Sequence, residues 1–128
     1  YWDPIAAHRV WQTAIPLLLC PLDVTNSVPV TADFMRQISR QRRYPLSDFV
    51  GQCYALIMDQ PYCFWDVLTT TYLGRPDLFE VGEWETIVIT AGPSQGRIKV
   101  QPGGRPIQAL HKVDLAGFHA YILQQWAR

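Results

Sequence analysis

The 128-residue sequence lacks the features that mark several common classes of protein. It has no apolar run of the roughly 18 residues that a membrane-spanning helix needs, so we expect no membrane partner. Its 11 basic and 11 acidic residues cancel, and a formal net charge of zero gives no reason to expect a nucleic-acid partner. It also contains no internal repeat.

Cysteine is scarce: the only thiols are Cys20, Cys53 and Cys63. An odd number of cysteines in apolar surroundings is typical of reduced core residues rather than of a disulfide framework. No C-x-x-C pair or histidine cluster indicates a zinc site. We therefore expect a reducing compartment, such as the cytoplasm.

The sequence also has no initiator methionine and no signal peptide. Only Tyr1 and Trp2 precede the first predicted helix. Asp3 and Pro4 begin that helix as a cap and first-turn pair.

What the sequence does contain is enough apolar material for one compact core, since 48% of its residues are hydrophobic. Turn and capping residues divide it into helical and extended segments. The pattern predicts an α/β fold in which helices flank a mainly parallel sheet, followed by a short hairpin around residues 102–104 and a terminal helix. Helices are predicted at residues 3–13, 31–40, 45–58, 66–74 and 114–126, and strands at residues 15–22, 84–90, 97–101 and 107–112.

The apolar segment 15–22 shows no alternation of polar and apolar residues, which is typical of a strand covered on both faces. We predict that it is fully buried, at or near the centre of the sheet. The polar turn 23–26 follows it, and the carboxyl edge of an α/β sheet is where ligands usually bind. These residues are therefore candidates for a binding site.

A second candidate segment begins the helix predicted at 66–74. Trp65 and Asp66 precede apolar residues that recur at helical spacing. A first-turn aspartate satisfies free N–H groups and suits the positive end of the helix dipole, so Asp66 could serve only to start the helix. Trp65 could likewise be only a core aromatic residue.

In this order and spacing, the two segments resemble the C-terminal part of the nucleoside hydrolases. In that family a Pro-Leu-Asp-Val-Thr strand end, here residues 21–25, is followed by a helix start in which His or Trp precedes Asp. The first predicted helix resembles the family's Trp-Asp-Pro-x-Ala-Ala helix. Trp65 before Asp66, and Asn26 after the strand end, look more like the purine-preferring subgroup than the inosine–uridine one.

The resemblance covers nearly all of the chain but only the second half of the family's catalytic machinery. The family's Asp-rich motif, D-x-D-x-x-x-D-D, has no counterpart here, and family members are more than twice this length. We therefore expect residues 1–128 to be the C-terminal portion of a single domain, partnered by the N-terminal portion of the same protein. The resemblance also implies a homo-oligomer.

The resemblance further implies cleavage of the N-glycosidic bond of a ribonucleoside. This reaction passes through an oxocarbenium-like transition state and needs a positioned water. In the family a bound Ca²⁺ holds that water, and Asp66 matches a metal-binding aspartate. Because Ca²⁺ takes roughly six to eight oxygen ligands, one carboxylate cannot hold it alone. Trp65 matches the position at which the purine-preferring subgroup stacks a tryptophan on the leaving base.

Four further residues are candidates for contacts with the substrate: Asn26, Tyr54, Met58 and Tyr62. Asn26 could instead bond its own backbone in a turn. Tyr54 and Met58 are four residues apart on a predicted helix, so core packing is an alternative for at least one of them. The three histidines match no catalytic position and are expected to be structural: His8, His111 and His119.

Three functions remain open at this point. The chain is part of an active nucleoside hydrolase, or a hydrolase-like protein that binds a nucleoside or another sugar-containing ligand without cleaving it, or a small α/β interaction domain. An Asp66 side chain that faces an open cleft together with Trp65 and residues 23–26 would favour the first two. An Asp66 that faces away from any cleft would favour the third.

Overall fold

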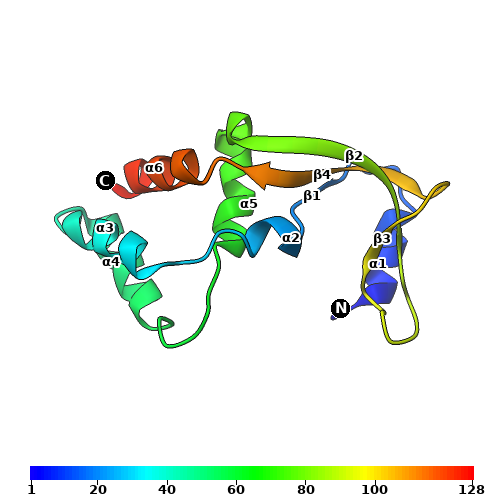
Figure 1. The fold of residues 1–128 in the computed structure, drawn as a ribbon, viewed down its shortest axis with the longest axis horizontal. Helices are drawn as coiled ribbons and strands as arrows, with labels where there is room; N and C mark the ends of the chain where they lie inside the picture. Colours follow the sequence, from blue (N-terminus) through cyan, green and yellow to red (C-terminus); the bar gives the residue numbers. More distant parts are fainter. The chain divides into compact units, whose positions relative to one another are not determined.

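The structure is a computed structural model that describes residues 1–128, and the chain divides into two compact units. The first unit comprises Tyr1–Leu19 and Val81–Leu110, and the second comprises Cys20–Glu80 and His111–Arg128. The elements, labelled in Figure 1, are in chain order α1 (Pro4–Trp11), β1 (Leu18–Leu19), α2 (Leu22–Thr25), α3 (Ala32–Arg40), α4 (Pro45–Ala55), α5 (Trp65–Gly74), the 3₁₀ helix η1 (Pro76–Leu78), β2 (Phe79–Val88), β3 (Ile98–Val100), β4 (Arg105–Val113) and α6 (Leu115–Trp126).

The sheet has four strands in the order β1-β4-β2-β3. β1 pairs with β4 in parallel, with Leu18 opposite Gln108. β2 and β3 form an antiparallel hairpin, with Thr86 opposite Val100. A mixed sheet with flanking helices, a short hairpin and a terminal helix confirms the predicted α/β class.

β1 is much shorter than the sequence predicts. Within the predicted strand 15–22 only Leu18 and Leu19 form ladder pairs, and both are half-buried. β1 has a single neighbour and lies at the edge of the sheet, so the prediction of a fully buried central strand was wrong for the described chain. Pro16 and Pro21 limit the strand on both sides, because proline has no N–H to donate to a ladder.

The short strand β3 pairs with a different neighbour from the one that the sequence predicts. It lies beside β2, and not beside β4 across the turn that follows it. Residues 89–97 connect β2 to β3, and the Ile89 N–H donates a hydrogen bond to the Arg97 carbonyl at 2.9 Å. Gly96 has a left-handed φ of 82°, and a Cβ at this position would lie 2.4 Å from the Tyr1 Cα. Only glycine therefore fits this turn.

Helix α1 of the first unit begins as predicted, with the Asp3 carboxylate accepting a first-turn hydrogen bond at 2.8 Å. No residue of α1 is buried, and Ile5 and Val10 are 52% and 41% exposed. The Trp11 indole donates a hydrogen bond to Thr86 Oγ1 at 2.9 Å, which joins the end of this helix to β2.

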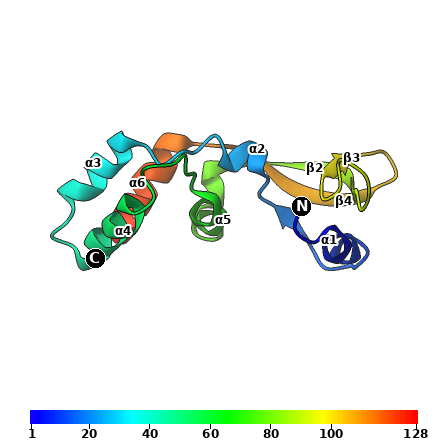
Figure 2. The ribbon, with the colours of Figure 1, turned by 90° about the horizontal axis from the view of Figure 1, so that it is seen from below.

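Helices α3, α5 and α6 lie within one residue of their predicted bounds, whereas α4 ends at Ala55 rather than at residue 58. Thr31 caps α3 by accepting a hydrogen bond from the Phe34 N–H, and Asp114 caps α6 by accepting one from the Gly117 N–H, each at 3.1 Å. α5 ends at Gly74. Figure 2 shows α3, α4 and α6 side by side, and all three pairs are in contact. None of the helices combines the length and the apolar character that a membrane span requires.

An aromatic cluster forms the core of the second unit. Phe34, Phe64 and Phe118 are at most 1% exposed. The ring of Phe64 lies 5.0 Å from that of Phe34 and 5.4 Å from that of Phe118. Burial of a side chain of this size contributes roughly 1.5–3 kcal/mol. Because the three rings come from α3, from the residue before α5 and from α6, the cluster holds these segments together.

All three cysteines are free thiols. Cys20 and Cys63 are half-buried, whereas Cys53 is exposed on α4, so the prediction of a core position was wrong for Cys53. On this helix the next residue, Tyr54, faces the core at 9% exposure, which turns Cys53 towards solvent.

His119 on α6 packs against the aromatic cluster. Its ring centroid lies 4.7 Å from that of Phe34, and its Nε2 is enclosed without a hydrogen-bond partner. Burial lowers the pKa of His119 from its ordinary value of 6.5. Folding therefore favours the neutral imidazole.

We expect His119 to make the second unit less stable in acid. Because the pKa of His119 is lower in the folded chain, its contribution to stability is fully present above about pH 6.5 and is lost as the pH falls below that value. Urea unfolding between about pH 7 and pH 5 should show a decline in the free energy of unfolding that His119→Leu makes shallower. The same decline in His119→Leu as in the unchanged protein would contradict this assignment.

Candidate functional site

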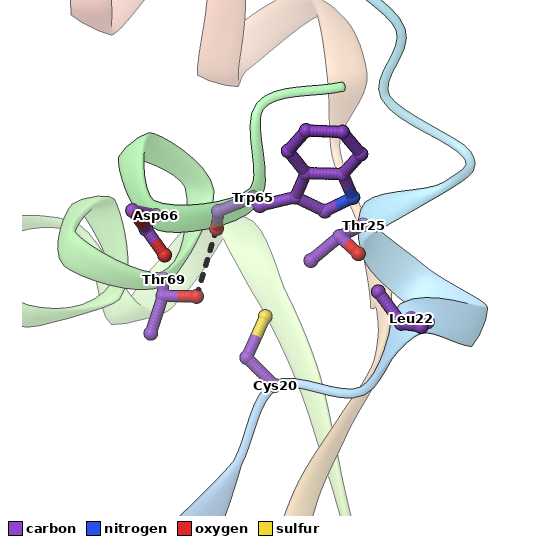
Figure 3. Close-up of a pocket in the computed structure, with 6 residues that line it drawn as sticks. All are labelled: Cys20, Leu22, Thr25, Trp65, Asp66 and Thr69. Carbon is purple, nitrogen blue, oxygen red and sulfur yellow. Dashed lines mark hydrogen bonds between the residues drawn. The ribbon is translucent and has the colours of Figure 1, made fainter. Parts of the chain in front are cut away.

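An open pocket of about 330 Å³ lies in the second unit, between the segment around α2 and the start of α5 (Figure 3). All of its lining residues belong to this unit. Its size is at the lower end of the range for small-molecule sites, which run from roughly 300 to 1,000 Å³. The lining residues are Cys20, Leu22, Thr25, Trp65, Asp66 and Thr69.

The start of α5 supplies the two residues of the pocket that the sequence singles out. α5 begins at Trp65, and Asp66 is the acidic residue of its first turn. Figure 3 shows the Trp65 indole extending from α5 towards Thr25, with Asp66 on the α5 side of the pocket. The Asp66 carboxylate is exposed in the first turn of α5, at the positive end of the helix dipole.

The polar segment 23–26 forms most of one helical turn, α2, rather than the turn without helix that the sequence predicts. Asn26 ends this turn, and its φ and ψ of −69° and −16° are helical. Thr25 is only 2% exposed, yet its Oγ1 has no hydrogen-bond partner. An unpaired hydroxyl beside a pocket is a group that a ligand or water can satisfy.

Trp65 is held by contacts on its nitrogen and on its ring. Its Nε1 donates a hydrogen bond to Asn26 Oδ1 at 3.5 Å. The ring centroid of Tyr62 lies 4.5 Å from that of Trp65, with an angle of 68° between the planes. The ring centroid of Tyr62 in turn lies 6.1 Å from that of Tyr54. A row of aromatic rings therefore leads from the core to the pocket.

The four candidate substrate contacts do not line the pocket in the described chain. Asn26 and Tyr62 contact the Trp65 side chain instead. Tyr54 is a core residue, and burial raises the pKa of its hydroxyl to about 12. Met58 lies beyond the end of α4 and is 38% exposed.

The pocket holds only part of what a calcium ion requires. Asp66 is its only carboxylate, and Thr25 and Thr69 add hydroxyl groups. No group of three or more His, Cys, Asp or Glu side chains in the chain could hold a metal ion. Because Ca²⁺ takes roughly six to eight oxygen ligands, these residues do not form a complete calcium site by themselves.

Cys20 and Thr69 are pocket residues that the sequence analysis does not select. Burial raises the pKa of the Cys20 thiol, and a hydrogen bond with Thr69 acts in the opposite direction. The thiol therefore favours its neutral form at the pocket wall. A single apolar cysteine and an exposed helix threonine carry no signal in the sequence that distinguishes them from packing residues.

The fold is that of an α/β protein. Its pocket is large enough for a small molecule, and an aspartate from the first turn of α5 lines it. Comparison with protein families then identifies the particular family. The sequence model described as inosine-uridine preferring nucleoside hydrolase matches residues 1–120. The chain belongs to this family, which confirms the resemblance seen in its sequence.

Individual relatives agree with this assignment. A non-specific ribonucleoside hydrolase of Salmonella paratyphi A is 28% identical over 131 residues, which cover 98% of this chain and 43% of that protein. The crystal structure of an inosine-uridine preferring nucleoside hydrolase from Bacillus anthracis is 42% identical with a TM-score of 0.89, and the match covers 98% of this chain and 41% of that one. A purine-preferring ribonucleoside hydrolase from Gardnerella vaginalis shares the fold, with 19% identity and a TM-score of 0.77. The chain spans less than half the length of these relatives.

We expect Cys20 to react slowly with thiol reagents. Iodoacetamide reacts with the thiolate form of cysteine. The raised pKa of Cys20 lowers the fraction of thiolate, and partial burial limits the access of the reagent, whereas Cys53 is exposed on α4. Mass spectrometry of the peptides that contain Cys20, Cys53 and Cys63 would give the three rates separately. Thr69→Val should slow Cys20 further, because it removes the hydrogen bond that lowers the pKa. A Cys20 that reacts as fast as Cys53 would contradict the described burial.

Proposed function

We propose that this chain is part of a nucleoside hydrolase that cleaves the N-glycosidic bond of ribonucleosides, with a preference for purines. The observation that carries the proposal is the pocket at the start of α5, where Trp65 and Asp66 lie side by side in a chain of this family. The pocket combines a flat aromatic surface for a base with a negative charge for the sugar end of the substrate. The complete protein supplies the rest of the site.

Asp66 has the position and exposure that an acid needs to act on a bound ligand. It lines the pocket from the first turn of α5, and its side chain is exposed there. We propose that it contributes one ligand to a Ca²⁺ ion, with the other ligands coming from the remainder of the complete protein. The bound ion would supply a positioned water. Asp66 would supply one negatively charged oxygen ligand from the pocket wall.

Trp65 is suited to stack on the leaving base. Its indole lies at the pocket wall, and an edge-to-face contact with Tyr62 occupies at most one face of the ring. A purine offers a larger flat surface than a pyrimidine, which supports the purine preference. An indole N–H does not ionise as an acid near neutral pH, so Trp65 cannot protonate the departing base. Its contribution is to stabilise the base by stacking.

The wider assembly follows from the same proposal. The N-terminal portion of the same protein would complete the site, and a homo-oligomer would be its assembled state. Direct substrate contacts by Asn26, Tyr54, Met58 and Tyr62 stay predictions, since none of them lines the pocket of the described chain.

Asp66→Asn should abolish hydrolysis in the complete protein. Loss of the charged ligand should lower kcat at least ~100-fold, because loss of an outer-shell partner alone costs roughly 10- to 100-fold in metal affinity or activity. Release of free ribose from inosine measures the activity, and calorimetry with Ca²⁺ measures the ion affinity. The free energy of unfolding should change by no more than about 1 kcal/mol, the usual contribution of an acidic residue in the first turn of a helix.

Asp33→Asn is the matched control for this change. Asp33 is the second residue of α3, as Asp66 is of α5, but it does not line the pocket. It should leave both hydrolysis and Ca²⁺ affinity unchanged. Unchanged hydrolysis in Asp66→Asn would overturn the proposed role of Asp66.

Trp65→Ala should lower the kcat for purine nucleosides more than it raises KM. Stacking of a base on an aromatic residue contributes roughly 1–3 kcal/mol, which corresponds to a loss of about 5- to 160-fold. Steady-state rates with inosine, guanosine and uridine would show the loss concentrated on the two purines. Equal losses for all three substrates would contradict the purine-stacking role.

A further inference from the structure

The contacts around Trp65 place Asn26 against the indole rather than in the pocket. The Asn26 side-chain oxygen accepts the Nε1 hydrogen bond at 3.5 Å, and Trp65, not Asn26, lines the pocket. The amide oxygen is engaged by the indole, and Asn26 lies outside the pocket lining. The geometry therefore favours an action of Asn26 through Trp65.

The backbone fixes the two residues opposite each other. The Val30 N–H donates to the Tyr62 carbonyl at 2.9 Å, and the Phe64 N–H donates to the Val28 carbonyl at 3.0 Å. Val28 and Phe64 are at most 1% exposed, so this connection is anchored in the core. Residue 26 and residue 65 each lie within two residues of it. Their separation is therefore set by the frame and not by two mobile loops.

The indole needs such a restraint because it lies at the very start of its helix. Trp65 is the first residue of α5, so no preceding helical turn lies beneath its side chain. The ring is only half-buried and could turn about its side-chain bonds. A hydrogen bond on one edge and the Tyr62 ring at 4.5 Å together select one orientation.

We propose that Asn26 is a positioning residue for Trp65: its side-chain oxygen, together with the Tyr62 ring, fixes the plane of the indole at the pocket wall. This inference rests on the proposed function, in which Trp65 stacks on the base. It gives Asn26 and Tyr62 a role in the preference for purines without a contact to the substrate.

A double-mutant cycle in the complete protein tests the proposal. The variants are Asn26→Leu, Trp65→Phe and the double variant, and kcat and KM are measured with inosine and uridine. Asn26→Leu should lower kcat for inosine about three- to tenfold, the worth of one hydrogen bond. In the Trp65→Phe background, which has no N–H to donate, the same change should have less than about a twofold effect. Asn26→Asp keeps the accepting oxygen and should retain the orientation of the indole.

Two further variants control the cycle. Leucine fits the helical backbone angles of residue 26, so Asn26→Leu should fold. Ser27→Ala changes the neighbouring residue, whose hydroxyl bonds the Val24 carbonyl, and should leave kcat unchanged. Tyr62→Leu should lower kcat for inosine in the same direction as Asn26→Leu. An undiminished effect of Asn26→Leu in the Trp65→Phe background would show a direct substrate contact and would overturn the proposal.

Fluorescence separates this proposal from the proposed function. The spectrum of the protein minus that of Trp65→Phe isolates the emission of Trp65. In the Asn26→Leu background, the same difference is taken against the double variant. It should be shifted and more strongly quenched by acrylamide, whereas the corresponding difference in the Ser27→Ala background should change in neither respect. An unchanged difference spectrum in Asn26→Leu overturns the positioning role even if hydrolysis is confirmed. A shifted spectrum in a protein without hydrolase activity upholds the contact and rejects only the proposed function.

Discussion

Two backbone hydrogen bonds between residues 28–30 and residues 62–64 hold the candidate site together. They bring the end of α2 beside the start of α5, although α3 and α4 lie between them in sequence. Phe64 serves this connection twice, because its N–H makes one of the bonds and its ring lies in the aromatic core. Without that anchor, Trp65 and Thr25 would not face the same pocket.

The chemistry of the pocket follows from how little charge it contains. Asp66 is the single carboxylate, while Thr25, Thr69 and Cys20 supply neutral groups, the last with a raised pKa. Such a set can orient a ligand but cannot assemble a water nucleophile, a metal ion and a general base together. The described residues therefore contribute one wall of an active site. This agrees with a chain that spans less than half the length of its relatives.

Trp65 shows how a residue at the edge of a core can serve a site. Its ring is one end of a series that runs through Tyr62 and Tyr54 into the buried aromatic cluster. Because packed rings resist displacement, the orientation of the indole is coupled to the stability of the second unit. The alternatives of a core aromatic and a base-stacking surface are therefore compatible in one side chain.

The sequence by itself determined the longer helices and the position of Asp66 at the start of α5, because caps and helical spacing are local signals, whereas the short helix α2 was not predicted. Asp3 caps α1 as predicted, and Thr31 and Asp114 cap α3 and α6 at the starts of two further predicted helices. The tertiary structure decided the rest. β1 is short and lies at an edge, and β3 joins β2, because strand pairing depends on partners far away in the sequence. Asn26 meets the Trp65 indole for the same reason: only the pairing of residues 28–30 with residues 62–64 brings two distant segments within hydrogen-bonding distance.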